Sequence, residues 1–591
     1  MFVVSGADTS LFYVPAKSDE LTKSDRRESM SIIPEEFLPP REHLPEKIYA
    51  LPELRLPDRL NIADYCIDRH VRAGRGEQVL IYFKNQKFTY RQMQETINRL
   101  ANALRKMGIE KNDRVMLRSE NNPRIFAAYF ACWRIGAIAV LTHHLLRAEE
   151  IAFRANDSEA KVMIASVKGF EDVKEARSSF KTVKDIILLD GKEEGCFSYD
   201  DLIADQSAEA ETADTGKNDL LRIIYSSGTT GKPKGIITSV GDIVCLMESY
   251  CLHILNLQPS DIIGGHPAFA FAFGFSLLLF PGFKGSSVSL VESFEPKQMF
   301  EIIQDHKISV LFCVPTAFRM MLGVQGAEKT YDCSSLRICQ SAGEWLPGIT
   351  VREWKKRFGM PIIDSVGSGD LNYWLTTTLD TPDEKLDSSG KPFPGVECKV
   401  VDELFNDAPV CTEGELLVRA PWGQQYWRRP DKQKEGVVRG WNRPGLIYME
   451  DKDGYFWYRG RNDEMIVSGG YKIPGGEVEA ALLQHPAVIE CAVIAAPDEV
   501  RGNIVKAFVI LREGYSGSEE LAAEMRDFVK QKIEVYKNPR AIEFVQTHEL
   551  PRTITGKIQR FALRELEKAK CKEVNQNSNF CLEPKEVRNV C

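Results

Sequence analysis

The chain has 591 residues, of which 43% are hydrophobic and 27% are charged, and its formal net charge is −8. This composition is typical of globular proteins and excludes collagen-like and largely disordered chains. The acidic balance argues against broad nucleic-acid binding, which needs a basic face to meet the phosphates. At about 100–200 residues per domain, the length predicts several domains, or one large and one small domain.

Membrane and export signals are not expected. The longest apolar run, residues 269–283, is interrupted by Gly274, Ser276, Pro281 and Gly282, whereas a helical membrane span needs about 20 apolar residues. The N-terminus lacks a basic segment followed by an apolar stretch, so no signal peptide is predicted. The 14 cysteines lie singly without a CxxC pair, which is typical of reduced thiols, and by elimination the expected location is cytoplasmic.

The N-terminal half shows two α/β patterns in succession. Residues 1–30 are polar and without periodicity, which predicts an extension outside the core. Residues 90–107 carry apolar side chains at helical spacing, and residues 113–118 are predicted to form a strand. A second α/β pattern extends from about 220 to 363. Strands that alternate with helices predict parallel sheets covered by helices.

The pattern of predicted secondary structure changes twice in the C-terminal half. Residues 398–458 contain short strands and turns, with a tight turn expected at Asp453-Gly454. The last hundred residues return to a small α/β unit, with a helix over 477–484 and strands over 489–494 and 505–511. We therefore predict an α/β protein. Its large N-terminal domain has two helix-covered sheets and a small strand-rich lobe, and a smaller, mobile α/β domain follows.

The most informative stretch follows a predicted buried strand at 220–225. Residues 226–235 consist only of Ser, Gly, Thr, Lys and one Pro. Glycines let backbone N–H groups face an anion, hydroxyls add donors, and lysines supply charge, so we predict a polyphosphate cradle. The segment does not match a Walker A loop. Ser226 stands where that loop has its first glycine, and Pro233 stands where it has its metal-binding hydroxyl residue. A flexible linker is the alternative, although linkers seldom follow a buried strand with so many hydroxyls and lysines.

Two further segments become informative when they are considered together with residues 226–235. Residues 550–560 place Gly556 beside Lys557, and residues 458–479 form a linker with hinge glycines. In this order and spacing, the three segments resemble those of the adenylate-forming superfamily of acyl-CoA synthetases, luciferases and peptide-synthetase adenylation domains. The resemblance covers about residues 40–568. It is closest to benzoate-type and 2-aminobenzoate-type CoA ligases, in residues 39–43, 267–274, 341–344, 454–458 and 536–544.

The resemblance implies a two-step acid–CoA ligase that uses ATP, Mg²⁺ and coenzyme A. ATP and a small carboxylate would give an acyl-adenylate and pyrophosphate, and the CoA thiol would then displace AMP. A benzoate-like acid is the expected substrate. A medium-chain or other acyl-CoA ligase, a low-turnover relative that binds nucleotide or acyl ligand, and a carrier-protein thiol as acceptor stay open.

The resemblance also implies a domain division and site residues. The divisions are an extension at 1–30, a large domain at 31–460, a hinge at 461–463, a small domain at 464–568 and a polar tail at 569–591. Lys557 would stabilise charge between the carboxylate and the α-phosphate. The phosphates would lie on Ser226, Ser227, Gly228, Thr229, Thr230, Gly231, Lys232 and Lys234. Adenine and ribose would lie on Ala342, Gly343, Glu344, Asp364, Ser365, Val366, Gly367 and Arg461.

The remaining implied residues serve the acid, the thiol and the metal. Phe271, Phe273 and Gly274 would line the acyl pocket, although an ordinary core strand would also show such phenylalanines. Gly469, Gly470 and Tyr471 would border the CoA tunnel, Asp463 would be the hinge residue, and Thr229 and Asp370 would hold Mg²⁺. For Arg461, a surface arginine is the alternative.

Three positions depart from the family pattern. Gly369-Asp370 stands where the family has Thr-Glu, so a hydroxyl is lost and the carboxylate is one methylene shorter. Leu446 stands where the family has an aspartate that binds the ribose hydroxyls. Loss of a charged acceptor costs about 1.5–3 kcal/mol of nucleotide binding, or roughly ten- to a hundredfold.

Overall fold

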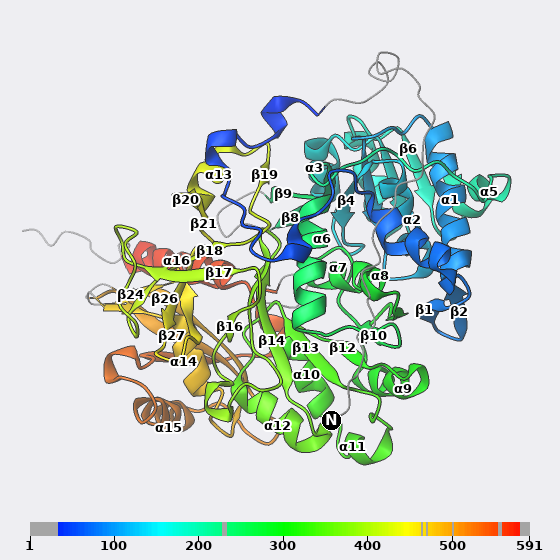
Figure 1. Cartoon of the computed structure of the whole chain (residues 1–591). Coiled ribbons are helices and arrows are strands. Elements are labelled where there is room, and N and C mark those ends of the chain that lie inside the picture. Colours follow the sequence, from blue (N-terminus) through cyan, green and yellow to red (C-terminus); the bar gives the residue numbers. More distant parts are fainter. Residues whose placement is uncertain are drawn as a thin grey trace, which may run out of the picture.

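The computed structural model describes residues 33–226, 233–462, 465–468, 471–498, 501–552 and 558–578 (Figure 1). Within these residues, one sheet has eight strands in the order β19-β9-β8-β4-β3-β5-β6-β7. They are β3 (Arg114–Arg118), β4 (Ile138–Thr142), β5 (Val162–Ala165), β6 (Asp185–Leu188), β7 (Phe197–Ser198), β8 (Leu220–Ser226), β9 (Lys234–Ser239) and β19 (Tyr426–Trp427). Neighbours from β8 to β7 are parallel, whereas β9 and β19 are antiparallel to their neighbours. Strands β3, β4 and β5 are fully buried, as expected for parallel strands covered on both faces.

A second sheet has nine strands in the order β16-β15-β14-β13-β12-β10-β11-β1-β2 within the described part of the chain. They are β1 (Val79–Phe83), β2 (Gln86–Thr89), β10 (Ile262–Gly265), β11 (Ser287–Leu290), β12 (Val310–Phe312), β13 (Ile338–Ala342), β14 (Ile362–Ser368), β15 (Asn372–Thr376) and β16 (Lys391–Pro392). Strands β14 to β1 along this order are parallel. The buried guanidinium of Arg222 on β8 donates to Asn372 Oδ1 on β15 at 2.8 Å and so ties the two sheets together.

Helices cover both sheets (Figure 1). They are α1 (Tyr90–Lys106), α2 (Pro123–Arg134), α3 (Ala148–Ser158), α4 (Phe170–Ala176), α5 (Tyr199–Ala204), α6 (Val240–Leu246), α7 (Ala272–Leu279), α8 (Pro281–Lys284), α9 (Pro296–His306), α10 (Pro315–Leu322), α11 (Ala327–Thr330) and α12 (Gly348–Phe358). Helix α1 confirms the predicted helix at 90–107. It starts with a capping box of Thr89 and Gln92 and buries the apolar face of Met93, Ile97 and Leu100. None of the described helices is long and apolar enough to cross a membrane.

The strand-rich lobe follows, with antiparallel pairing throughout. It contains β17 (Glu397–Val401), β18 (Glu413–Arg419), β20 (Val437–Val438), β21 (Trp441–Asn442), β22 (Leu446–Glu450), β23 (Phe456–Arg461) and the helix α13 (Pro430–Gly436). The predicted turn is confirmed, because the Gly454 N–H donates to the Asp451 carbonyl at 2.9 Å and Gly454 has a φ of +77°.

The C-terminal unit consists of β24 (Ile466–Ser468), β25 (Tyr471–Ile473), α14 (Gly475–Leu482), β26 (Val488–Asp498), β27 (Gly502–Leu511), α15 (Glu519–Lys530), β28 (Ala541–Phe544) and α16 (Arg560–Ser578). Its helix α14 contacts β23 of the lobe. The predicted α/β architecture, with two helix-covered sheets, a strand-rich lobe and a smaller C-terminal unit, is confirmed. Both predicted terminal strands are longer than expected, and α16 continues past residue 568.

Candidate functional site

The described site residues that belong to the two large sheets lie near the carboxyl ends of their parallel strands. Strand β8 leads into the phosphate loop, and β10, β13 and β14 end at the acyl and adenine segments. His143, just after β4, stacks on Phe271, which follows β10, with ring centroids 5.1 Å apart and an interplanar angle of 30°. This contact joins the two carboxyl edges. In parallel α/β sheets, ligands bind in the crevice at this edge.

The two segments predicted to hold adenine lie side by side. Strands β13 and β14 are parallel neighbours, with Ala342 paired to Ser365. Gly343 follows with a φ of +96°, a conformation that favours glycine. The Glu344 carboxylate accepts a hydrogen bond of 2.9 Å from Thr316 Oγ1, which fixes its direction.

Several buried polar atoms at this edge have no hydrogen-bond partner within the described residues. They are Ser226 Oγ at the end of β8, Ser341 Oγ on β13 and Asp364 Oδ1 on β14. Ser341 and Asp364 are paired across the two strands. Since buried polar groups are nearly always hydrogen-bonded, these atoms fit a site that receives a polar ligand.

Asp370 is held by a triangle of hydrogen bonds that the sequence did not reveal. Lys234 Nζ donates to Asp370 Oδ2 at 2.8 Å, and the Tyr426 hydroxyl donates to the same oxygen at 2.9 Å. Lys234 Nζ also donates to the Tyr426 hydroxyl at 3.1 Å. Lys234 lies on β9 and Tyr426 on the neighbouring β19, whereas Asp370 lies between β14 and β15. The triangle therefore connects the phosphate loop to the opposite sheet.

The segment predicted to line the acyl pocket is not a strand. Phe271 precedes α7, and Phe273 and Gly274 lie in its first turn. The Phe273 ring packs on Phe312 with centroids 5.4 Å apart. A Cβ on Gly274 would lie 2.0 Å from the Ala268 carbonyl oxygen, so close backbone packing requires glycine there. The segment is therefore not a strand, but Phe273 is buried in the hydrophobic core, as the core alternative expects.

His143 was missed by the sequence interpretation. Its burial, and then the neighbouring His144, lower the pKa of His143 to about 3, so its imidazole is neutral at physiological pH. The neutral ring of His143 also stacks on His144, with centroids 4.4 Å apart, so it backs the partly buried ring of Phe271. The sequence contained no signal for this contact, because the two residues are far apart in the chain.

The remaining described residues come from the lobe and the C-terminal unit. Leu446 on β22 is paired directly opposite Arg461 on β23. Tyr471 is 56% exposed and stacks on Tyr536 with ring centroids 4.7 Å apart. A hydrogen bond to Glu490, and more weakly the charge of Glu344, raise the pKa of Arg552. Arg552 therefore lies within electrostatic reach of the predicted adenine segment.

Other predicted site residues lie outside the described residues, so their roles stay predictions. They are Ser227, Gly228, Thr229, Thr230, Gly231, Lys232, Asp463, Gly469, Gly470 and Lys557. In the described part of the chain, no group of three His, Cys, Asp or Glu side chains is arranged to hold a metal. Mg²⁺ in nucleotide sites is usually held by one or two carboxylates and the phosphates, which Asp370 would fit.

Comparisons with known proteins agree with this geometry. The model of the AMP-binding enzyme family matches residues 67–427, and that of the AMP-binding enzyme C-terminal domain matches residues 477–557. The chain belongs to the AMP-binding enzyme family. It is an acid–thiol ligase of the adenylate-forming superfamily, which uses ATP, Mg²⁺ and coenzyme A and forms an acyl-adenylate.

Individual relatives span most of this AMP-binding enzyme. The benzoate–CoA ligase of Thauera aromatica is 33% identical over 87% of this chain and 97% of its own length. The acetyl-coenzyme A synthetase of Bacillus subtilis is 32% identical over 86% of this chain and 91% of its own. The crystal structure of the anthranilate CoA ligase AuaEII with anthranoyl-AMP superposes with a TM-score of 0.83, at 32% identity over 88% of this chain and 100% of that one.

Tyr426→Phe in this AMP-binding enzyme is expected to lower kcat/KM for ATP about tenfold, because a hydrogen bond to a charged group is worth about 1.5–3 kcal/mol. In this variant, Asp370 would keep the hydrogen bond from Lys234 but lose the one from the Tyr426 hydroxyl. The carboxylate predicted to bind Mg²⁺ would be less well positioned, so the Mg²⁺ concentration that gives the half-maximal rate should rise. Steady-state rates across a Mg²⁺ titration measure both. Tyr90→Phe is the control, since that buried hydroxyl donates to the Ser286 carbonyl away from the site. Equal Mg²⁺ requirements in both variants would contradict a positioning role.

Asp364→Asn is expected to stabilise the protein increasingly as pH rises. Burial raises the pKa of Asp364 well above its usual value. Above the unfolded pKa of about 4, the unfolded carboxyl is ionised while the folded one keeps its proton, so this group costs up to about 1.4 kcal/mol of stability per pH unit until the folded pKa is reached. Asparagine escapes this loss. Urea midpoints from pH 5 to 9 test this, with Asp380→Asn as the exposed control. A difference independent of pH would refute it.

Proposed function

We propose that this enzyme activates a benzoate-like aromatic carboxylate and transfers the acyl group to coenzyme A. The single observation that carries the aromatic assignment is the partly buried ring of Phe271 at the junction of the two sheets, which is backed by the neutral ring of His143. A planar aromatic acid would stack on it, and aromatic pairs contribute about 0.5–1.5 kcal/mol beyond their buried area. The similarity to benzoate and anthranilate CoA ligases supports the proposal.

In the proposed mechanism, each predicted residue acts on charge or position. The residues of the Ser226–Lys234 segment would bind the β- and γ-phosphates, with Ser226 Oγ as one free hydroxyl. Lys557 would stabilise the charge that develops as the carboxylate attacks the α-phosphate. Mg²⁺, on Asp370 and Thr229, would supply further neutralisation of the phosphates. Glu344, Asp364 and Arg461 would hold the nucleoside together with the other predicted adenine and ribose residues.

The proposed domain movement separates the two half-reactions. Lys557 must leave before the CoA thiol enters, and rotation about Asp463 would bring the segment at 469–471 to the tunnel instead. We retain the division at 31–460, 461–463 and 464–568 for this movement.

The eleven described cysteines are free thiols, which fits a reducing compartment, and we propose a cytoplasmic location.

Incubation of the purified protein with ATP, Mg²⁺, CoA and a mixture of aromatic and aliphatic acids tests the proposal. Mass spectrometry should detect an aroyl-CoA. A medium-chain acid is the second candidate substrate class. The chain is almost as similar in sequence to an acetyl-coenzyme A synthetase as to a benzoate–CoA ligase, so aliphatic acids are included in the mixture. Direct competition between benzoate and octanoate separates the two, and exclusive octanoyl-CoA formation would overturn the aromatic assignment.

Phe271→Ala is expected to lower kcat/KM for benzoate about three- to tenfold relative to octanoate, because a stacking surface is lost. The ratio of the two thioesters in one competition mixture measures this directly. Phe153→Ala is the matched control, since the Phe153 ring packs on Tyr225 instead. An unchanged ratio of the two thioesters in Phe271→Ala would show that the Phe271 ring does not determine the preference for benzoate.

A further inference from the structure

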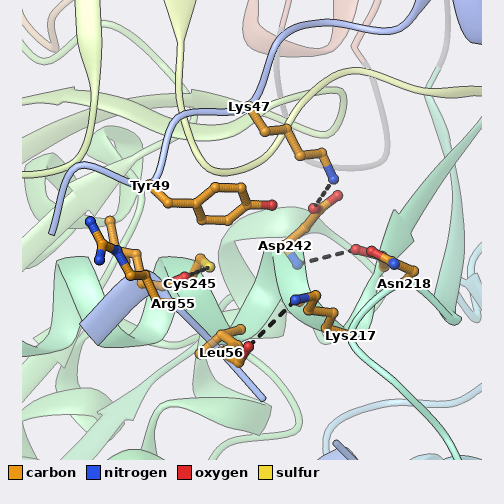
Figure 2. Close-up of a pocket in the computed structure, with 11 residues that line it drawn as sticks. Lys47, Tyr49, Arg55, Leu56, Lys217, Asn218, Asp242 and Cys245 are labelled. Carbon is orange, nitrogen blue, oxygen red and sulfur yellow. Dashed lines mark hydrogen bonds and ion pairs between the residues drawn. The ribbon is translucent and has the colours of Figure 1, made fainter. Parts of the chain in front are cut away.

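A cavity of about 310 Å³ lies at the end of β8 opposite the phosphate loop. It is lined by Lys47, Tyr49, Leu54, Arg55, Leu56, Lys217, Asn218, Ser239, Gly241, Asp242 and Cys245 (Figure 2). Residues 217 and 218 precede β8 and Ser239 ends β9, whereas the phosphate loop joins the other ends of these strands. Since a strand rises about 3.3 Å per residue, β8 separates the cavity from the catalytic site by about 20 Å.

The cavity carries an excess of positive charge. Lys47 is neutralised by Asp242, at 2.5 Å. Lys217 pairs with Asp58 at 2.9 Å, but the Asp58 side chain is 94% exposed, and such pairs are weak. Arg55 forms no ion pair with any residue that the structure describes. One cation is therefore uncompensated and a second is loosely held, so the cavity favours an anion.

The opposite wall offers an acceptor and an aromatic surface. In Figure 2, the ring of Tyr49 lies between Arg55 and Asp242. Tyr49 is 43% exposed, so its ring is available for contact. Asp242 is only 2% exposed, yet its Oδ2 lacks a hydrogen-bond partner among the described residues. An unsatisfied buried carboxylate oxygen is costly, and a donor from a ligand would satisfy it.

We propose that this cavity is a second ligand site, for a small organic anion with an aromatic or apolar body and a hydroxyl or amino donor. The anionic group would lie at Arg55, with Lys217 adding positive charge from another side of the cavity, and the donor would lie at Asp242. The body would lie on Tyr49, Leu54 and Leu56. The volume is at the lower end of the range of about 300–1,000 Å³ for small-molecule sites, which suits a compact metabolite.

Fluorescence titration with 8-anilinonaphthalene-1-sulfonate tests the site, because this probe combines an aromatic body, a sulfonate and an N–H donor. The full-length enzyme is first saturated with an acylsulfamoyl adenosine, so that the probe cannot report the catalytic site. Arg55→Gln/Lys217→Gln is expected to weaken probe binding at least tenfold. Lys329→Gln/Lys356→Gln removes two exposed lysines elsewhere and is expected to change nothing. Matching thermal midpoints show that both variants are folded.

Displacement of the probe then defines the ligand. Mandelate, which has an aromatic ring, a carboxylate and a hydroxyl, should displace it at lower concentration than inorganic phosphate. Naphthalene-1-sulfonate, which lacks the donor, should bind more weakly than the probe. Equal probe affinity in the two double variants, or absence of binding to the blocked wild-type enzyme, would overturn the site. Displacement by phosphate as effective as by mandelate would overturn the proposed ligand class.

Discussion

Replacement of Lys557 by alanine is expected to lower the rate of acyl-adenylate formation by a factor of about 10²–10³, the typical loss when one preorganised group that stabilises transition-state charge is removed. Thioester formation from a supplied aroyl-adenylate should be nearly unchanged, because in the proposed mechanism the lysine leaves the site before that step. Pyrophosphate exchange measures the first half-reaction, and CoA consumption with synthetic aroyl-AMP measures the second.

Described residues next to the segment of Lys557 support a role confined to adenylation. Arg552 and Ile558 flank residues 553–557 and form an isolated antiparallel bridge. Arg552 is also within electrostatic reach of Glu344 at the predicted adenine segment. Lys557→Arg keeps the charge and should retain more activity than alanine, and Lys568→Ala is an exposed control on α16. Equal loss of both half-reactions in Lys557→Ala would contradict a role confined to adenylation.

Leu446→Asp is expected to lower KM for ATP by about ten- to a hundredfold, since a hydrogen bond to a charged group contributes about 1.5–3 kcal/mol. Leu446 and Arg461 are directly opposite on antiparallel strands, so their side chains share one face of the lobe sheet. The new carboxylate would therefore lie beside the residue predicted to bind the ribose hydroxyls. Initial rates over an ATP titration measure the effect.

Leu446→Asn is the matched control, because it has nearly the same size as aspartate without the charge, and its gain should be smaller. Thermal midpoints report whether either polar residue disturbs the packing of Leu446 at the edge of the core. An unchanged KM in Leu446→Asp would show that the ribose is held without this position. Turnover that rises steeply from near zero would identify the natural chain as a low-turnover binding relative.

Local patterns in the sequence predicted most of the architecture. The apolar spacing of residues 90–107 predicted α1, and the buried run before Ser226 predicted β8, because periodicity and continuous burial are properties of short segments. Alternation of strands and helices predicted the parallel sheets. The departures at Gly369, Asp370 and Leu446 were also visible directly, since they are differences in residue type.

The sequence by itself thus determined the fold class, the family and the chemical groups available for catalysis. Only the tertiary structure decided which groups meet: Tyr426 with Asp370, and His143 with Phe271. It also decided that Asp364 is buried without a charged partner and that Lys47 and Lys217 line one cavity. The physical reason is that these contacts join residues far apart in the chain, which sheet order and register bring together and no local spacing encodes.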